Sequence, residues 1–111
     1  MFHYTDNAGF KAISSQVAWT FKASVPRGPH PLGAYFTQLN PETPKLAKKL
    51  RMPQWKMEWL FEFDGTAGLV PIDEGKGRGA YIFFSPADYI VEPVRQRFRD
   101  QPVSYQQGAN E

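Results

Sequence analysis

Residues 55–64 read WKMEWLFEFD, and apolar side chains alternate with charged ones along most of this stretch. The apolar positions that keep this spacing are Met57, Trp59, Phe61 and Phe63, and Leu60 is the break in the pattern. A period of two is typical of a strand that buries one face and exposes the other. We therefore expect a half-buried β-strand in this stretch.

The chain after this strand continues as a series of short extended segments. We expect a turn at 65–68, an extended segment at 69–72, a glycine-rich loop at 73–79, a strand at 80–84, a tight connection at 85–87 and an extended segment at 88–93. These connections are too short for the crossovers that parallel strands need. Antiparallel pairing is therefore favoured.

Two short helices are expected before this strand. The first begins at Asp6, whose carboxylate can accept hydrogen bonds from the amides of the next turn. Its buried face carries Phe10, Ile13 and Val17, which recur at helical spacing.

The second helix is expected to begin with Thr43 as N-cap and Pro44 in the first helical position. Leu46 and Leu50 lie four residues apart on its buried face, and Pro53 ends it. This helix and the first are the convincing helices of the chain.

Residues 33–37, GAYFT, predict a short buried strand that follows a proline-rich loop at 26–31. Helices early and strands late indicate an α+β fold. The length predicts one domain, over residues 1–102, with a flexible tail at 103–111.

The composition excludes several classes of protein. The chain has no cysteine, so it has no disulfide, zinc-thiolate site, iron–sulfur cluster or cysteine nucleophile. Its two histidines, His3 and His30, have no acids at ligand spacing around them, and we expect no metal. The formal net charge of +2 is too small to mark a dedicated nucleic-acid binder.

The sequence predicts a soluble chain that acts in the cytoplasm, of the producer or of a target cell. No apolar run approaches the ~18 residues of a membrane span, and the first residues lack the pattern of a secretory signal. The nucleophile elbow and the phosphate-binding glycine motifs are also absent. Residues 75–79, GKGRG, lead into a strand rather than a helix, and we interpret them as a loop.

Four segments carry short motifs in a fixed order. They are FHYTDNAGFKAI at 2–13, FKAS at 21–24, GAYFTQLNP at 33–41 and ADYIVEP at 87–93. In these segments the chain resembles the bacterial ADP-ribosyltransferase toxins defined by a His-Tyr-Asp signature. That family is a small branch of the superfamily that includes diphtheria toxin and the poly(ADP-ribose) polymerases. The resemblance spans residues 2 to about 93.

The resemblance implies a split β-sandwich of two small antiparallel sheets with two short helices, and NAD held as substrate in the cleft between the sheets. His3 matches the histidine that binds a ribose hydroxyl of NAD, and Tyr35 matches the aromatic residue that stacks on nicotinamide. Asp88 matches the catalytic acid, and Ser24 a small polar position that orients the ribose or the histidine. Tyr4, Thr5 and Phe36, next to these residues, complete the implied NAD-binding set, with backbone beside His3 holding the carboxamide.

The chemistry of NAD cleavage explains why a carboxylate is needed. Breaking the nicotinamide–ribose bond gives an oxocarbenium-like centre, which a fixed carboxylate stabilises more in the transition state than in the ground state. Such a group contributes about 3 kcal/mol. Nicotinamide leaves as a neutral ring, so no second acid has to protonate it.

The chain also departs from the family that it resembles. Arginine-directed members have Glu or Gln two residues before the acid, where this chain has Pro86, so an arginine acceptor is not expected. Glu92, four residues after Asp88, is a second choice for the acid. The acceptor, a protein or a nucleic acid, stays open, as does hydrolysis of NAD instead of transfer. An immunity protein or antitoxin is a further possible partner of such a toxin or effector.

Other interpretations compete with this one. The cationic stretches, Lys45 to Lys56 and Arg95 to Arg99, suit a solvated face, but also an RNA-binding or ribosome-dependent nuclease toxin. A catalytically silent NAD-binding module is a third possibility. Taken singly, His3 suits a surface histidine near a chain end, Tyr35 a core aromatic and Asp88 a turn residue.

Overall fold

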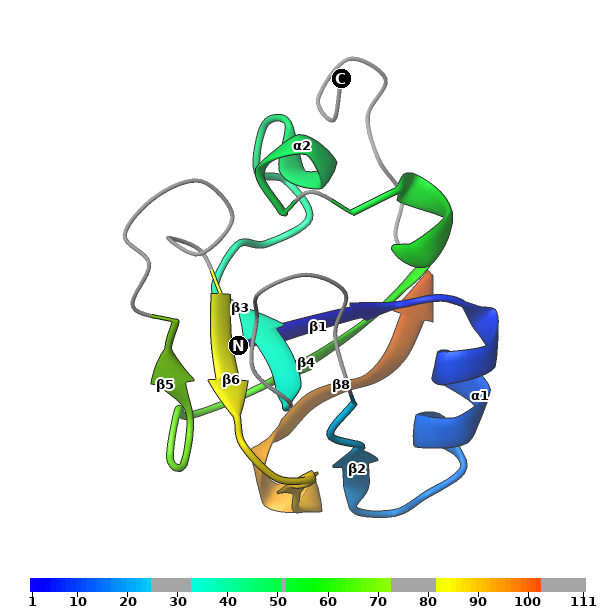
Figure 1. Cartoon of the computed structure of the whole chain (residues 1–111). Helices are drawn as coiled ribbons and strands as arrows, with labels where there is room; N and C mark the ends of the chain where they lie inside the picture. Colours follow the sequence, from blue (N-terminus) through cyan, green and yellow to red (C-terminus); the bar gives the residue numbers. More distant parts are fainter. Residues whose placement is uncertain (25–32, 51, 73–81, 103–111) are drawn as a thin grey trace.

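A computed structural model describes residues 1–24, 33–50, 52–72 and 82–102, with only the backbone described over 98–102. It shows a small α+β domain with two antiparallel sheets and two short helices (Figure 1). The loops expected at 26–31 and 73–79 and the tail expected at 103–111 lie outside the described residues.

The larger sheet has six strands in the order β5-β6-β3-β1-β4-β8. These strands are β1 (Phe2–Thr5), β3 (Ala34–Thr37), β4 (Trp59–Phe63), β5 (Val70–Pro71), β6 (Ile82–Ser85) and β8 (Gln96–Pro102). Every pair in it is antiparallel, as the short connections predicted. The N-terminal strand β1 lies inside the sheet, and the backbones of Met1 and Phe63 exchange two hydrogen bonds beside it.

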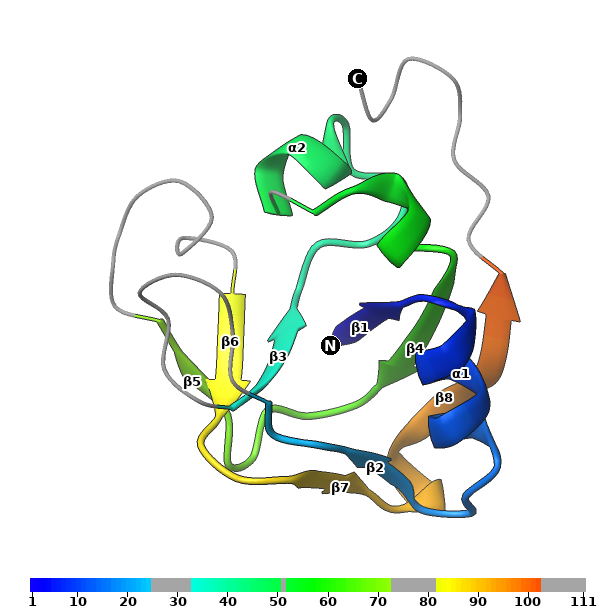
Figure 2. The same ribbon diagram turned by 45° about the vertical axis from the view of Figure 1, so that its right-hand side comes forward.

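The smaller sheet consists of β2 (Trp19–Phe21) and β7 (Tyr89–Val91), which pair antiparallel from Trp19 opposite Val91 to Phe21 opposite Tyr89. It packs with helix α1 (Asn7–Ser14) against one face of the larger sheet, and helix α2 (Leu46–Leu50) covers the other (Figure 2).

Each face of the larger sheet has its own apolar core. The core on the side of the smaller sheet is formed by Ile13, Trp19, Phe21, Ala34, Phe36, Phe61, Phe63, Leu69, Tyr89 and Val91. The core under α2 is formed by Tyr4, Leu46, Ala47, Leu50, Met57, Leu60, Ile72 and Ile82. Leu60, the break in the alternating pattern, therefore belongs to the second core, so β4 buries side chains on both faces.

Helix α1 begins where the sequence predicted. Asp6 is its N-cap, and the carboxylate accepts a hydrogen bond of 2.9 Å from the backbone amide of Gly9. The expectation for Val17 is wrong because the helix ends at Ser14, and Val17 is 76% exposed.

Helix α2 is shorter than predicted. Lys45 has a backbone φ of 56°, in the left-handed region, so the helix cannot extend back to Pro44 and Thr43 is not its N-cap. Instead, the hydroxyl of Thr43 donates to the side chain of Asn40 at 3.2 Å. The buried pair Leu46 and Leu50 is confirmed.

Two strand boundaries differ from the expectations, and two further strands were not expected. Residues Gln54–Lys56 form one turn of 3-10 helix after Pro53, so β4 begins at Trp59 rather than near residue 55. The extended segment expected at 88–93 ends at Val91, because Pro93–Arg95 form another 3-10 turn. Strands β2 and β8 were not expected at all.

Candidate functional site

The larger sheet opens between its two central strands. β1 pairs with β4 along its whole length, from Phe2 opposite Glu62 to Thr5 opposite Trp59. With β3, however, it pairs at one position only, Phe2 opposite Thr37. The paired register of β1 and β3 does not continue beyond this position.

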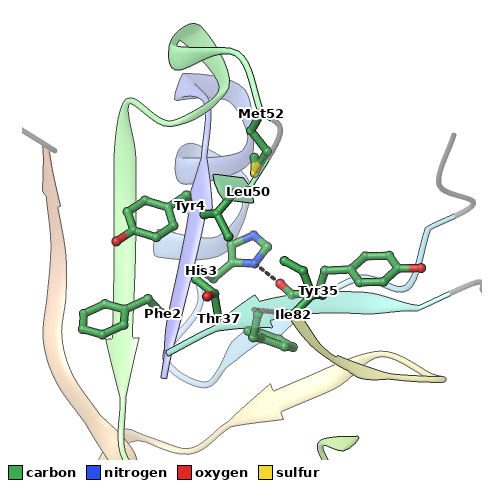
Figure 3. A pocket seen from close by; sticks show the side chains of 9 residues that line it. Phe2, His3, Tyr4, Tyr35, Thr37, Leu50, Met52 and Ile82 are labelled. Atoms are coloured by element: carbon green, nitrogen blue, oxygen red, sulfur yellow. Dashed lines mark hydrogen bonds between the residues drawn. The ribbon is translucent and has the colours of Figure 1, made fainter. Parts of the chain in front are cut away.

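His3 lies at this opening. Its Nδ1 is 2.9 Å from the carbonyl oxygen of Tyr35 on β3 (Figure 3). A carbonyl only accepts hydrogen bonds, so Nδ1 carries the proton and the neutral ring presents the lone pair of Nε2. The imidazole also contacts the rings of Phe21, with centroids 4.7 Å apart, and Phe36, 5.4 Å apart.

The surroundings keep this imidazole neutral. Burial lowers the pKa of His3 to about 4, and the hydrogen bond to Tyr35 offsets only part of that effect. At neutral pH the side chain is therefore a hydrogen-bond donor at Nδ1 and an acceptor at Nε2. Among the described residues, no group donates a hydrogen bond to Nε2.

A pocket of about 170 Å³ lies beside His3, on the α2 side of the opening. It is lined by Phe2, His3, Tyr4, Tyr35, Phe36, Thr37, Leu50, Met52 and Ile82 (Figure 3). Most of this lining is apolar. A cavity of roughly 150 Å³ is enough to hold benzene. The pocket therefore suits one six-membered ring with a small substituent, but not a whole dinucleotide.

The two hydroxyl-bearing side chains besides Tyr35 in this lining are used within the fold. The hydroxyl of Tyr4 donates to the carbonyl of Leu39 at 2.8 Å, and Thr37 Oγ1 accepts from the backbone amide of Leu39 at 3.1 Å. Both bonds fix the segment that follows β3. His3 Nε2 thus differs from them in having its lone pair available to a ligand.

Tyr35 contacts His3 through its backbone. Its side chain points away from the imidazole in Figure 3 and stacks with Phe84, with ring centroids 6.1 Å apart. Tyr35 also belongs to the pocket lining. A role for this ring as a platform for nicotinamide stays a prediction.

Asp88 lies elsewhere, just before β7 at the end of the smaller sheet. Its Oδ1 accepts a hydrogen bond of 2.7 Å from the backbone amide of Ala23, and its Oδ2 is 3.7 Å from Lys22 Nζ. Both charged side chains are exposed. The carboxylate thus ties the residues after β2 to the start of β7.

The predicted site residues therefore fall into two groups. His3, Tyr4, Tyr35 and Phe36 line one pocket, whereas Thr5, Ser24, Asp88 and Glu92 are not in its lining. Ser24 is exposed and pairs with Gly33 through backbone hydrogen bonds of 3.0 and 3.1 Å. This bridge joins the end of β2 to the start of β3.

Sequence reasoning missed the remaining pocket residues, Phe2, Thr37, Leu50, Met52 and Ile82. Leu50 was found as a buried helix residue, and Thr37 as part of a strand. Their convergence depends on the pairing of distant strands, which no local pattern encodes. Phe2 and Thr37 had a sequence signal, since they belong to the first and the third motif.

Arg95 and Arg97 of the second cationic stretch contact neighbouring segments of the chain. Arg95 Nε donates to the carbonyl of Asp64 at 2.8 Å, a terminal nitrogen donates to the Tyr89 hydroxyl at 2.8 Å, and the guanidinium lies over the Phe63 ring. Arg97 is 3.7 Å from the Asp64 carboxylate. These contacts favour a structural role over a nucleic-acid interface. Around α2, by contrast, Lys45 and Lys48 are exposed.

Comparisons with protein-family models, with curated proteins and with solved structures find no match for this chain. Within residues 1–24, 33–50, 52–72 and 82–102, no three histidine or acidic side chains gather into a group that could hold a metal ion. None of the helices in these ranges is long and apolar enough to cross a membrane.

Proposed function

We propose that this chain is an NAD-splitting toxin or effector domain of the ADP-ribosyltransferase type. It cleaves the nicotinamide–ribose bond of NAD and transfers ADP-ribose to a macromolecular acceptor or to water. The observation that carries the proposal is the ring-sized pocket beside His3 in the opening between β1 and β3. The structure itself establishes a two-sheet α+β domain, and the assignment to this fold family belongs to the proposal.

The pocket chemistry supports a pyridine ring as the ligand. Its apolar walls suit a flat aromatic ring, and a neutral imidazole offers one hydrogen-bond acceptor. The contact between His3 and Tyr35, 32 residues apart in the sequence, also supports the resemblance, which implies that these two residues share one site. Nicotinamide occupies the pocket in this proposal, and the ribose and pyrophosphate extend beyond it.

In this proposal the nicotinamide ring fills the pocket, and the reacting carbon lies at its open side. The acid that stabilises the cation at the anomeric carbon is then expected beyond the ring pocket, and the position of Asp88 outside the lining is compatible with that role. Asp88 holds Ala23, next to the Ser24–Gly33 bridge that leads into β3. We propose Asp88 as the electrostatic catalyst and keep Glu92, which is exposed after β7, as the alternative acid.

The helix that closes the pocket supports attraction of the rest of the dinucleotide. α2 contributes Leu50 to the lining and carries Lys48, with Lys45 just before it. Both lysines are exposed, so their positive charge is available to a pyrophosphate in solvent. Their contribution should fall as the salt concentration rises.

Labelled NAD incubated with the chain and a cell lysate tests the proposal. We expect release of nicotinamide, with the label on protein, on nucleic acid or in free ADP-ribose, which also distinguishes transfer from hydrolysis. Asp88→Asn keeps an oxygen that can accept from Ala23 but removes the charge. It should lower nicotinamide release at least ~100-fold, and the matched variant Glu92→Gln should not.

Three other results would decide against parts of this proposal. A strong loss in Glu92→Gln with near-normal turnover in Asp88→Asn would transfer the catalytic role to Glu92. Stabilisation by NAD without release of nicotinamide would indicate a silent NAD-binding module. Stabilisation by oligonucleotides but not by NAD would favour the nuclease or RNA-binding alternative.

A further inference from the structure

We infer that the first cationic stretch, Lys45 to Lys56, is a binding surface for single-stranded nucleic acid. Lysines of this stretch pair with the phosphates, and the indole of Trp55 stacks on a base. The inference goes beyond the proposed function, because binding of the strand requires neither NAD nor Asp88. It predicts that short oligonucleotides bind to the chain without NAD, and that Trp55 and the lysines contribute to this binding in different ways.

The positive charge of the chain is concentrated in this stretch. Five of the thirteen Lys and Arg residues lie in residues 45–56, which contain none of the eleven Asp and Glu residues. The rest of the chain therefore has eight cationic side chains against eleven acidic ones. The formal net charge of +2 thus combines one cationic segment with an otherwise acidic chain, and a local field of this kind can attract a polyanion.

The lysines of α2 present this charge to solvent. Lys48 is exposed, as is Lys45 just before the helix, and Lys49 is partly exposed. Among the described residues, none of these three side chains forms an ion pair with a carboxylate. The apolar residues of α2 are buried in the core beneath it, so the lysines occupy the outer side of the helix. Their charge is therefore available to phosphates.

Trp55 adds an aromatic ring to the same surface. It lies in the 3-10 turn Gln54–Lys56, which follows α2 at the same end of the domain (Figures 1 and 2). Trp55 is 60% exposed, and Nζ of Lys56 lies over its ring, 5.2 Å from the centroid. The other two tryptophans differ, since Trp19 is 1% exposed and Trp59 is partly buried. Trp55 is thus the tryptophan whose ring a ligand can reach.

A single strand of nucleic acid matches both features of this surface. Its phosphates carry the negative charge that lysines attract, and each of its bases has a flat face that can stack on an aromatic ring. Proteins that bind single strands without sequence preference combine these same two groups, a cationic surface and stacking side chains. The bases of a duplex are already stacked on one another, so the unpaired strand is the form that fits.

Two other polyanionic partners match the surface less well. Leu46, Ala47 and Leu50 of α2 are buried, so a lipid bilayer would meet no apolar helix face here. Trp55 is the exposed large apolar side chain among the described residues of the stretch. An acidic protein segment would pair with the lysines but would bring no base to the indole. Anionic vesicles and polyglutamate represent these two partners in the experiment.

The experiment measures binding of labelled oligonucleotides by fluorescence anisotropy, with the full chain and without NAD. Oligouridylate and oligodeoxythymidylate of about twelve nucleotides are the probes, and a difference between them identifies RNA or DNA as the source of the strand. We expect binding that weakens as the salt concentration rises, because paired phosphates release counterions. Polyphosphate, polyglutamate and vesicles of phosphatidylglycerol and phosphatidylcholine should bind at least ~5-fold more weakly at equal charge, because they bring no base to stack.

Variants at Trp55 separate stacking from charge. Trp55→Leu keeps an apolar side chain but has no π face, so it should weaken oligonucleotide binding at least ~5-fold and leave polyphosphate binding unchanged. Trp55→Phe keeps a stacking ring and should retain most of the affinity. The position is exposed, so both variants should fold, which urea denaturation checks. Equal affinities in Trp55→Leu and the native chain would overturn the inference.

A double variant, Lys48→Gln with Lys49→Gln, tests the contribution of charge. Loss of two phosphate contacts should reduce the slope of log affinity against log salt by up to about 1.4. The control is Lys11→Gln with Lys22→Gln, which removes the same charge from exposed positions on other elements and should keep the slope. Equal slopes in the two double variants would show that binding follows net charge rather than this surface, and would overturn the inference.

The remaining outcomes also decide between partners. If polyphosphate or polyglutamate binds as tightly as the oligonucleotides, the partner is an acidic polymer without bases and the inference is wrong. Binding to the vesicles without binding to oligonucleotides would identify a membrane surface instead. Release of nicotinamide from NAD by a chain that binds no oligonucleotide refutes the inference alone. Oligonucleotide binding by a chain that neither binds nor cleaves NAD refutes the proposed function alone.

Discussion

Polar side chains have opposite roles in two regions of the molecule, the opening between β1 and β3 and the end of the smaller sheet. At the opening, His3 lies among aromatic rings with one hydrogen bond and one lone pair that no described residue uses. At the end of the smaller sheet, Asp88 is exposed, and its two oxygens face an amide and a lysine. The first arrangement leaves a polar atom for a ligand, whereas the second uses its polar atoms to hold backbone together.

This difference indicates which of the two residues contributes to ligand binding and which to the stability of the fold. A partly buried acceptor without a protein partner is poorly solvated in the unliganded protein, and a ligand that donates to it gains a hydrogen bond. An exposed carboxylate with partners costs little and contributes little. His3 should therefore dominate ligand selection and pH dependence, and Asp88 should be removable with little loss of stability.

The largest effect is expected at Phe21, which supports the His3 side of the comparison. Its ring is 1% exposed and contacts His3 and Phe36. Phe21→Ala should lower the free energy of unfolding by about 3–5 kcal/mol, measured by urea denaturation. Ile90→Ala, on the exposed side of the same small sheet, is the control and should change it by less than about 0.5 kcal/mol. Similar losses in both variants would contradict this packing.

The second effect is a dependence of stability on pH that comes from His3. Its pKa is about 4 in the folded chain, against an ordinary value of 6.5. Between these values the unfolded chain binds one proton more, so the free energy of unfolding should rise with pH from 4 to 6.5 and receive no further contribution from His3 above that range. The rise should total up to about 3 kcal/mol.

Denaturant unfolding of the native chain and of His3→Asn over this pH range measures that contribution. The difference in stability between the two proteins should grow with pH and level off near pH 6.5. Two curves that run parallel would show that His3 titrates alike in the folded and unfolded chains.

The smallest effect is expected at Asp88. Asp88→Ala removes the acceptor for the Ala23 amide and should lower the free energy of unfolding by about 1 kcal/mol. Asp88→Asn keeps an acceptor and should stay within about 0.5 kcal/mol of the native chain, because the ion pair with Lys22 is exposed. A large loss in Asp88→Asn would mean that the charge itself stabilises the fold.

Local patterns predicted the parts of the fold that depend on local chemistry. Alternation in residues 55–64 gave β4, and the carboxylate of Asp6 gave the start of α1. The start of α2 was missed because Lys45 adopts a left-handed conformation. Glycine or asparagine at this position would have indicated such a conformation, but lysine rarely adopts it. Strand β8 was missed because its sequence, QRFRDQP, is mostly polar, as suits an edge strand.

The site was predictable only in part. The order of motifs brought out His3 and Tyr35, which the structure places in contact, although His3 taken alone suggested a frayed chain end. The pocket itself draws Leu50, Met52 and Ile82 from distant segments. Their convergence follows from strand order and from the single pairing of β1 with β3, which are properties of the whole sheet.

The central claim is that the nicotinamide end of NAD binds against Nε2 of His3. The most direct test is an NMR titration of the ¹⁵N-labelled His3 side chain in Asp88→Asn. Without ligand, the spectrum should show a neutral ring protonated at Nδ1. NAD should then shift the Nε2 resonance in the direction of a new hydrogen bond while Nδ1 changes little. An Nε2 resonance that stays unchanged at saturating NAD would contradict the account.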